Sequence, residues 1–132
     1  MNGILNILKP PGMTSHDVVS YVRRLYGLKK VGHAGTLDPA AAGVLPIFLG
    51  QATRLIEYTA NATKSYRAEM TFGFETDTGD DTGMTVRKGE AGLPDRQQVE
   101  AALNCFRGLI TQTPPVYSAI KIGGKKLYEL AR

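Results

Sequence analysis

The first part of the chain contains a pattern typical of a strand, followed by one typical of a helix. Residues 3–8 alternate weakly between apolar and polar side chains, and the turn-forming sequence Lys9-Pro10-Pro11-Gly12 follows, which predicts a strand that ends there. A helical pattern then begins after Thr14 or Ser15, either of which can cap a helix, and ends at Gly27. The apolar face of this predicted helix consists of Val18, Val22 and Leu25, with Val19 and Tyr26 alongside.

A second apolar run, residues 44–50, predicts a short buried strand. Pro46 lies inside this run and favours an edge strand or a bulge, because proline cannot donate a hydrogen bond to a neighbouring strand. Residues 51–58 then suit a short helix that buries Leu55 and Ile56.

Apolar and polar side chains alternate between Ser65 and Phe74, which predicts a half-buried strand. The apolar side of this strand consists of Tyr66, Ala68, Met70 and Phe72. Residues 76–83 are rich in Asp, Thr and Gly and predict a loop with Asx-type turns, after which residues 84–86 return as a strand.

A second helix is predicted between Asp95 and Gly108. Asp95 and Gln98 have the spacing of a capping box, and Gly108 closes the pattern. The apolar stripe of this helix consists of Val99, Ala102, Leu103 and Phe106. Cys105 lies in the same apolar pattern, so we expect it in the core.

Beyond this helix, residues 109–113 and 117–122 are candidate strands on either side of a Pro-Pro pair, and residues 123–124 predict a Gly-Gly turn. A further helix is expected to begin at Lys125, and its pattern runs to Arg132 without a cap or a breaker, so we expect the chain to be a fragment. Because strands and helices are interspersed rather than strictly alternating, the pattern favours an α+β fold over a doubly wound parallel sheet.

Composition narrows the class of protein. A chain of 132 residues with 42% hydrophobic and 21% charged residues is typical of one globular domain, and a second domain is not expected. No apolar run approaches the roughly 20 residues that span a bilayer, and a signal-peptide pattern is absent, so we expect a cytoplasmic protein. One cysteine and two histidines offer no internal disulfide and no metal-ligand cluster. The net charge of +4 permits a polyanionic partner without requiring one.

The candidate catalyst is Asp38, in the stretch Gly32–Pro46 of mostly small, rigid and apolar residues. Apart from Asp38, no acidic residue occurs between Asp17 and Glu57. Glycines allow a close approach of the backbone to a ligand and Pro39 stiffens the loop, so this carboxylate could be held where burial and hydrogen bonds tune it. An Asp before Pro can equally cap the N–H groups of a turn, and composition does not choose between the two interpretations.

Other motifs point to no chemistry. The triplets Asp77-Thr78-Gly79 and Asp81-Thr82-Gly83 resemble the aspartic-protease signature, but that chemistry brings together two carboxylates from separated segments. The same loop has the glycine and the terminal Glu of an EF-hand misplaced. Gly123-Gly124-Lys125-Lys126 lacks the spacing of a P-loop and predicts a tight hairpin turn.

Six motifs occur in the order typical of one family. They are Lys9-Pro10-Pro11-Gly12-Met13-Thr14-Ser15, Gly32-His33-Ala34-Gly35-Thr36-Leu37-Asp38-Pro39, Ala42-Gly43-Val44-Leu45, Lys64-Ser65-Tyr66, residues 73–83, and Gln112-Thr113-Pro114-Pro115-Val116-Tyr117-Ser118-Ala119. From about residue 3 to its end, the chain resembles the N-terminal part of the tRNA pseudouridine synthase B (TruB) family, bacterial enzymes that isomerise uridine 55 in the T loop of tRNA. The resemblance implies a mixed, largely antiparallel sheet flanked by helices. It also implies that residues 1–132 are the N-terminal portion of a catalytic domain whose C-terminal half and RNA-binding domain are absent.

The resemblance assigns roles to individual residues. Asp38 matches the catalytic aspartate, and Tyr66 matches the active-site tyrosine that stacks on the target base and is a candidate for proton transfer at C5. His33 falls where the family has a histidine that contacts the T loop, and Lys9 belongs to the motif that braces the active-site loop. The residues expected to serve RNA binding are His33, Lys9, Lys64, Tyr117 and Lys121. From the residues alone, Tyr66 could also be a half-buried strand aromatic and His33 a hydrogen-bonded turn residue.

The implied reaction needs no redox cofactor, nucleotide or metal, and its partner is tRNA with the target base flipped out. In the family, the second half supplies an arginine that pairs with the catalytic aspartate, an apolar contact to the base and an RNA-binding domain. Without them we expect the isolated chain to be inactive or nearly so, and to self-associate. Two alternatives stay open: an RNA-binding or folding-helper module without catalysis, and an enzyme that acts on free nucleosides.

Overall fold

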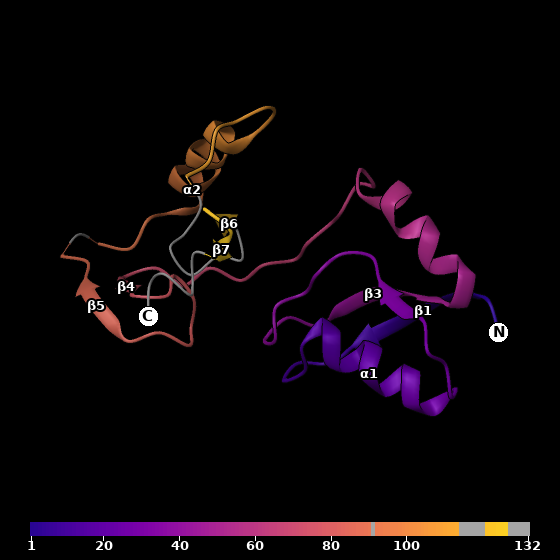
Figure 1. Ribbon diagram of the computed structural model, residues 1–132. Coiled ribbons are helices and arrows are strands. Elements are labelled where there is room, and N and C mark those ends of the chain that lie inside the picture. The colour runs from indigo at the N-terminus through magenta and orange to yellow at the C-terminus, as the bar shows by residue number, and fades with distance from the viewer. Residues whose placement is uncertain (91, 114–120, 127–132) are drawn as a thin grey trace. The chain divides into compact units, whose positions relative to one another are not determined.

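Residues 1–90, 92–113 and 121–126 are described by a computed structural model of the chain, and they form an α+β fold of helices and antiparallel sheets. The chain divides into two units, Met1–Tyr66 and Arg67–Arg132, which we call the first unit and the second unit. Figure 1 shows the first unit in indigo to magenta and the described residues of the second unit in salmon to yellow. Each unit is described by itself.

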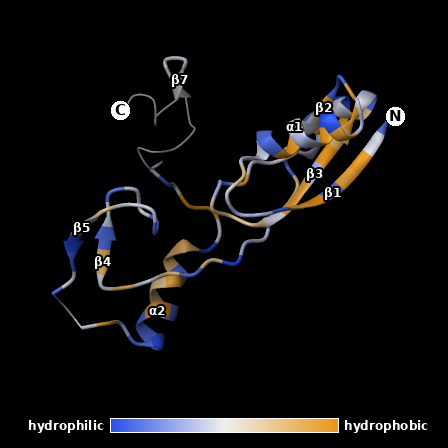
Figure 2. Cartoon of the chain, turned by 90° about the horizontal axis from the view of Figure 1, so that it is seen from below, coloured by the Kyte–Doolittle hydropathy of each residue, from blue (hydrophilic) through white to orange (hydrophobic). Residues whose placement is uncertain are grey.

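A three-stranded antiparallel sheet forms the centre of the first unit. It consists of β1 (Gly3–Lys9), β3 (Gly43–Leu49) and β2 (Val31–His33), in the order β1-β3-β2. The two predicted strands are thereby confirmed, whereas the sequence pattern gave no signal for β2. Figure 2 shows that β1 and β3 are largely hydrophobic, as expected of strands that border a core.

The prediction that Pro46 marks an edge or a bulge is wrong, because β3 is the central strand. The carbonyl of Pro46 accepts a hydrogen bond from the N–H of Ala34 (3.0 Å), one residue beyond the end of β2 at His33. The N–H and C=O of a strand residue point to the same side, so the hydrogen that proline lacks would face β2 and not β1. Pairing with β1 therefore runs the full length of β3, while β2 is short.

The helix α1 (Ser15–Leu25) covers one face of this sheet, as Figure 1 shows. It begins with a capping box, in which Thr14 accepts from the N–H of Asp17 and the Asp17 carboxylate accepts from the N–H of Thr14. The core of the unit is formed by Val18, Val19, Val22, Val31, Leu45, Ile47 and Leu49. Leu25 is 63% exposed, so its predicted place on the buried face is wrong.

The other face of the sheet is partly covered by η1 (Gly50–Thr59), a 3-10 helix where a short helix is predicted. Ile56 of η1 is half-buried over Gly32, where a Cβ atom would lie 2.7 Å from the Ile56 Cδ1 atom. Glycine at position 32 thus makes room for η1 on the sheet. Leu55 is half-exposed, so the prediction that it is buried is wrong.

The second unit contains a hairpin of β4 (Phe74–Thr76) and β5 (Thr85–Lys88), whose strands pair antiparallel. The return strand after the predicted loop is confirmed. The predicted strand over residues 65–74 is wrong except at its last residue, and Tyr66, Met70 and Phe72 are exposed. Alternation marks a segment that suits a sheet, but a strand also needs a neighbour, and the described residues provide none for residues 65–73.

Asp80 organises the loop between β4 and β5. Its Oδ1 atom accepts hydrogen bonds from the Thr78 hydroxyl (2.7 Å) and from the N–H (2.9 Å) and hydroxyl (2.6 Å) of Thr82, while its carbonyl accepts from the Thr76 hydroxyl (2.7 Å). These side-chain turns confirm the predicted Asx geometry. The hydroxyls of Thr82 and Thr78 and the Thr82 N–H hold the pKa of Asp80 below its ordinary value, because they stabilise the carboxylate.

The second unit also contains α2 (Arg96–Leu103), which continues into η2 (Asn104–Phe106). The predicted capping box of Asp95 and Gln98 is present, with the Gln98 N–H donating to the Asp95 carboxylate at 2.8 Å. The apolar stripe of this helix is not buried, and Cys105 is exposed rather than in the core as predicted. In this part of the chain, sequence signals that depend on contacts within a few residues thus predict the structure correctly. Signals that depend on burial in a core do not.

The remaining predictions fall on the end of the chain. Residues 109–113 form no strand, contrary to prediction. The predicted Gly-Gly turn is confirmed, since it joins the two-residue strands β6 (Lys121–Ile122) and β7 (Lys125–Lys126). Lys125 therefore begins a strand rather than a helix, and residues 114–120 and 127–132 lie outside the described residues. Among the residues that the structure describes, no helix is long and apolar enough to cross a membrane.

Candidate active site

The loop between β2 and β3, residues 34–42, carries Asp38 near its middle, and we call it the Asp38 loop. Next to the end of β2, the loop turns at Gly35, whose φ of +89° is accessible to glycine at little cost. The Nδ1 atom of His33 forms a hydrogen bond with the Gly35 carbonyl, and the N–H of Ala41 donates to the Asp38 carbonyl at 3.0 Å. The loop therefore has a defined backbone path on both sides of Asp38.

On the N-terminal side of Asp38, the loop is fixed by Ser15, the first residue of α1. The Ser15 hydroxyl accepts a hydrogen bond from the N–H of Leu37 (2.9 Å) and lies 3.2 Å from the Leu37 carbonyl. Ser15 is buried, and the Leu37 side chain packs against the core. Leu37 also contacts Gly43, where a Cβ atom would lie 3.3 Å from the Leu37 Cδ1 atom. The sequence suggested Ser15 only as an alternative cap; Thr14 is the cap, and Ser15 holds the loop.

On the C-terminal side of Asp38, the loop is fixed through the carbonyl of Pro39. This oxygen accepts from the N–H of Gly12 (2.8 Å) and lies 3.4 Å from the Lys9 Nζ atom. The Lys9 ammonium also donates to the carbonyls of Met13 (2.7 Å) and Pro10 (3.0 Å), and the side chain is fully buried. A buried ammonium is costly without such acceptors, so Lys9 and the turn that follows it depend on each other.

These contacts agree with the bracing role that the family resemblance implies for Lys9. The three protons of its ammonium all face carbonyl oxygens, so the side chain as placed offers none to an RNA phosphate. Lys9 thus holds the Asp38 loop from inside the unit.

The Asp38 side chain itself is exposed. No hydrogen bond or ion pair to its carboxylate occurs within the described part of the chain, so the expectation that burial and hydrogen bonds shelter this group is wrong for these residues. The physical reason is that the contacts from Ser15, Lys9 and Gly12 all reach the backbone on either side of Asp38 and leave its side chain outside. The loop presents the carboxylate but does not enclose it.

No hydrogen bond or ion pair of the described residues joins the other predicted site residues to the Asp38 side chain. Tyr66, the last residue of the first unit, is 72% exposed, and no hydrogen bond of the described residues joins it to the Asp38 loop. Lys64 is exposed, with its Nζ atom 3.3 Å from the Ala62 carbonyl. His33 is half-buried at the end of β2, with its ring on the Gly35 carbonyl, the hydrogen-bonded turn geometry that its alternative interpretation describes.

Two predicted residues fall near the end of the chain. Tyr117 lies outside the described residues, and Lys121 begins β6. Their roles stay predictions.

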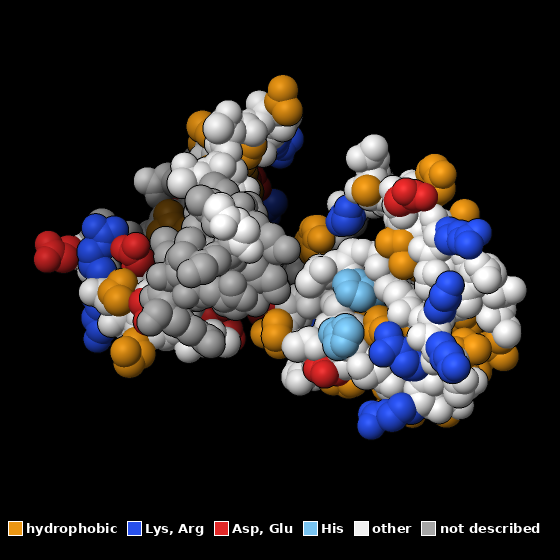
Figure 3. Space-filling view, in the orientation of Figure 1, with side chains coloured by type: hydrophobic (Ala, Val, Ile, Leu, Met, Phe, Trp, Pro, Cys, Tyr) orange, Lys and Arg blue, Asp and Glu red, His pale blue; other side chains and the backbone are white. Residues whose placement is uncertain are grey.

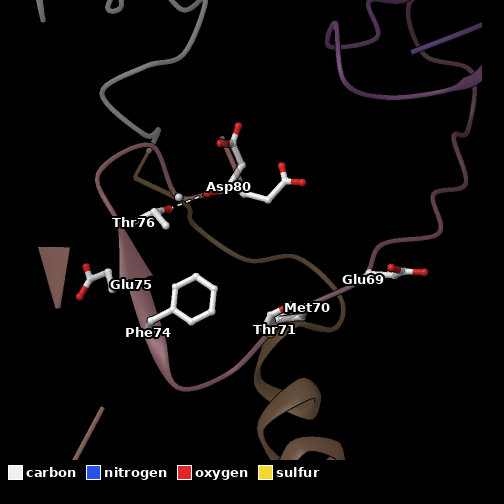
Figure 4. A pocket seen from close by; sticks show the side chains of 9 residues that line it. Glu69, Met70, Thr71, Phe74, Glu75, Thr76 and Asp80 are labelled. Carbon is white, nitrogen blue, oxygen red and sulfur yellow. Dashed lines mark hydrogen bonds between the residues drawn. The ribbon is translucent and has the colours of Figure 1, made fainter. Parts of the chain in front are cut away.

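A pocket of about 320 Å³ lies in the second unit and contains none of the predicted site residues. Its lining includes the Phe74 ring, Thr76 and the acidic side chains Glu69, Glu75 and Asp80, shown in Figure 4. These carboxylates give the pocket a negative lining, which repels phosphate groups. In the described ranges no group of three or more His, Cys, Asp or Glu side chains is placed to hold a metal ion.

Comparison with known proteins gives consistent matches. Residues 23–132 match the model of the TruB family pseudouridylate synthase, N-terminal domain. The chain is 59% identical over 132 residues to the tRNA pseudouridine synthase B of Symbiobacterium thermophilum and 60% identical over 133 residues to that of Alkaliphilus oremlandii. Each match covers 100% of this chain and 44% of the relative, so the chain spans less than half the length of these curated relatives.

A solved structure also shares the fold. The chain is similar to a protein in the crystal structure of a Cbf5–Nop10–Gar1 complex, with a TM-score of 0.60 and 31% sequence identity. That match covers 90% of this chain and 31% of the solved chain.

Proposed function

Because the chain belongs to the TruB family of pseudouridylate synthases, we propose that it serves the isomerisation of uridine 55 to pseudouridine in the T loop of tRNA. Two relatives that match the whole chain are named tRNA pseudouridine synthase B, which supports tRNA as the substrate. A tRNA substrate would place the reaction in the cytoplasm.

The reaction rearranges bonds within one nucleotide. The N1–C1′ bond of uridine breaks, the uracil turns, C5 bonds to C1′, the proton on C5 leaves, and N1 takes up a proton. Nothing is oxidised, reduced or hydrolysed, so the balance requires no further reactant. A carboxylate suits this chemistry in two ways, because it can attack C1′ covalently or remove a proton from C2′. We propose that Asp38 is this carboxylate and leave both routes open.

The observation that carries the proposal is the way in which the Asp38 loop is held. The backbone of Leu37 is bonded to buried Ser15, and the carbonyl of Pro39 is bonded to Gly12 and Lys9. An ordinary surface aspartate needs no such support on both sides. Catalysis gains from a reacting group whose position is fixed before the substrate arrives, and these contacts fix the backbone that carries Asp38.

The target uridine has to leave its stack to reach Asp38, and an aromatic face can replace the stacking that it loses. We propose Tyr66 for this role, worth roughly 1–3 kcal/mol for one stacked base. His33, Lys64, Tyr117 and Lys121 are proposed to contact the RNA.

The exposure of Asp38 affects the activity that we expect of residues 1–132 by themselves. A carboxylate in bulk water lacks the low-dielectric surroundings that strengthen catalytic electrostatics. We therefore propose that residues 1–132 alone bind tRNA and turn it over slowly or not at all, which is also the alternative of a binding module without catalysis. Exposed apolar side chains in the second unit support self-association of the isolated chain.

The test is a chimera in which residues 1–132 replace the matching region of the Symbiobacterium thermophilum relative, so that the rest of that protein is supplied. We expect the chimera to release tritium from tRNA labelled at C5 of uridine 55, and the Asp38→Asn chimera to release none while it still binds tRNA. Glu57→Gln is the matched control, because it removes another exposed carboxylate of the first unit. Tritium release by the Asp38→Asn chimera would refute the assignment.

Two further measurements separate the proposed function from its alternatives. Release of tritium by residues 1–132 alone at the rate of the chimera would contradict the expected inactivity. Turnover of free uridine as fast as that of tRNA would favour an enzyme of free nucleosides.

A further inference from the structure

The positive charge of the chain is concentrated in one unit. The first unit has seven Lys and Arg residues against three Asp and Glu, whereas the second unit has nine of each. The whole net charge of +4 is therefore carried by Met1–Tyr66. Figure 3 shows Lys and Arg side chains gathered on one face of the first unit, around α1, with both histidines on the same face.

Within that unit, basic and aromatic side chains alternate over ten residues, Tyr21–Lys30, which form the end of α1 and the turn that follows it. Arg24, Lys29 and Lys30 are exposed, and the residues Tyr21 and Tyr26 are 56% and 42% exposed. No Asp or Glu occurs between residues 18 and 37. Across the described ranges, none of the ion pairs includes a basic residue of this segment.

Stabilisation of α1 does not explain this pattern. Arg24 lies in the last turn of α1, where a cation interacts favourably with the helix dipole. Lys29 and Lys30 follow the turn at Gly27 and are outside the helix, so the helix dipole does not explain their positive charges. Burial does not explain an aromatic residue at position 21 either, because Tyr21 is more than half exposed. Uncompensated cations among exposed aromatic rings are typical of a surface that binds nucleic acid.

We propose that residues 21–30 form an RNA-binding surface separate from the Asp38 loop, which we call the α1 surface. Arg24, Lys29 and Lys30 would contact backbone phosphates, and Tyr21 and Tyr26 would stack on unpaired bases. The identity of the RNA as tRNA rests on the proposed function.

The α1 surface is joined to the Asp38 loop by a single short strand. Lys30 immediately precedes β2, and His33 is its last residue. At the usual rise of a strand, these residues are roughly 10 Å apart, which is about the rise of three nucleotides in a helical strand. One RNA strand can therefore contact Lys30 and the vicinity of His33 together, so the α1 surface would set the register of the RNA on the Asp38 loop.

The test is the affinity of residues 1–132 for an unmodified tRNA transcript, measured by fluorescence anisotropy at several salt concentrations. The variant is Lys29→Ala/Lys30→Ala, and the matched control is Lys88→Ala/Arg107→Ala, which removes the same charge from exposed residues of the second unit. We expect the first variant to lower affinity about tenfold at low salt and to reduce the salt slope by about 1.5, as for two lost phosphate contacts. The control is expected to change the affinity less than about twofold, as for charges without a phosphate contact.

The aromatic part of the α1 surface has its own control. Tyr21→Ala is expected to lower affinity about fivefold or more, whereas Tyr58→Ala, at another exposed tyrosine of the first unit, should have little effect. Equal effects of the two lysine-site variants, or displacement of tRNA by poly-glutamate as readily as by unlabelled tRNA, would overturn the proposal, because attraction would then depend on net charge alone.

Failure of this proposal and failure of the proposed function give different results. If the α1 surface is wrong, its variants bind tRNA as the controls do, while the chimera still makes pseudouridine through Asp38. If the proposed function is wrong, the chimera makes none, while the Lys29→Ala/Lys30→Ala variant still binds the transcript, here as an RNA probe, more weakly than its control does.

Discussion

The two units of this chain contain the same kinds of local sequence signal but differ in what those signals build. The first unit packs α1 against a sheet around a core that includes fully buried Ile47. In the second unit, none of the described residues is buried. Both α1 and α2 nevertheless begin with a complete capping box. Local hydrogen bonds thus form in both units, and only the first adds the burial of apolar surface, which is the dominant favourable term in folding.

The difference between the units shows which sequence signals are sufficient by themselves to predict local structure. A cap or an Asx turn is satisfied by residues two to four positions apart, so it forms wherever its own sequence occurs. An apolar stripe needs a second element on which to pack. The stripe of α2 has the spacing of a buried face, yet Leu103 and Phe106 are exposed. The stripe therefore predicts the helix correctly and its burial incorrectly.

The largest expected effect comes from truncating one apolar residue in each unit. Ile47→Ala should lower the free energy of unfolding by about 2–5 kcal/mol, because Ile47 is fully buried and its removal leaves a cavity. Leu103→Ala should lower it by less than about 1 kcal/mol, because that side chain is 45% exposed. Urea unfolding followed by circular dichroism measures both. Equal losses of unfolding free energy in the two variants would contradict the proposed difference between the units.

A smaller effect is expected for lysines in the two units. Lys9→Met should cost about 1–3 kcal/mol, because it removes partly buried hydrogen bonds to the carbonyls of Met13 and Pro39, whereas Lys88→Met removes an exposed side chain at little cost. Amide hydrogen exchange should also accelerate at Gly12 and in the Asp38 loop of the Lys9→Met variant. Unchanged exchange there would show that Lys9 does not hold the loop.

The smallest effect is expected when the pH is lowered and the two hydrogen-bonded carboxylates become protonated. Threonine hydrogen bonds lower the pKa of Asp17 in the cap of α1, from the hydroxyl and N–H of Thr14, and lower the pKa of Asp80 in the β4–β5 loop. A lowered pKa in the folded state means that the contribution is present above the ordinary pKa and is lost as pH falls through the folded value, from about pH 5 downwards. Since the loop has no buried residue to support it, we expect it to lose order first.

Amide chemical shifts of Thr82 and Thr14, followed by NMR during acidification, measure this order. Asp80→Asn is the control for the loop, because its amide cannot ionise. A Thr14 signal that changes at higher pH than Thr82 would contradict the expected sequence of events.

Much of the first unit can be predicted from its sequence, and particular residues show where prediction stops. Thr14 and Gly27 bound α1 through contacts within a few residues, and the pattern contained both. The support of the Asp38 loop was harder to foresee, because the partner of Ser15 is Leu37, 22 residues away. Contacts at that separation leave no periodic trace in one sequence. The motifs that carry the family resemblance, by contrast, pointed to Asp38 and Lys9 together.

Pro46 has a consequence for how the Asp38 loop arises. Its carbonyl accepts a hydrogen bond from the Ala34 N–H, but its nitrogen has no hydrogen to donate in return, and the pairing of β2 with β3 ends there. The missing donor in the central strand thus coincides with the end of its neighbour β2, and residues 35–42 lie outside the sheet. The Asp38 loop thus begins next to the residue of β3 that lacks a backbone N–H.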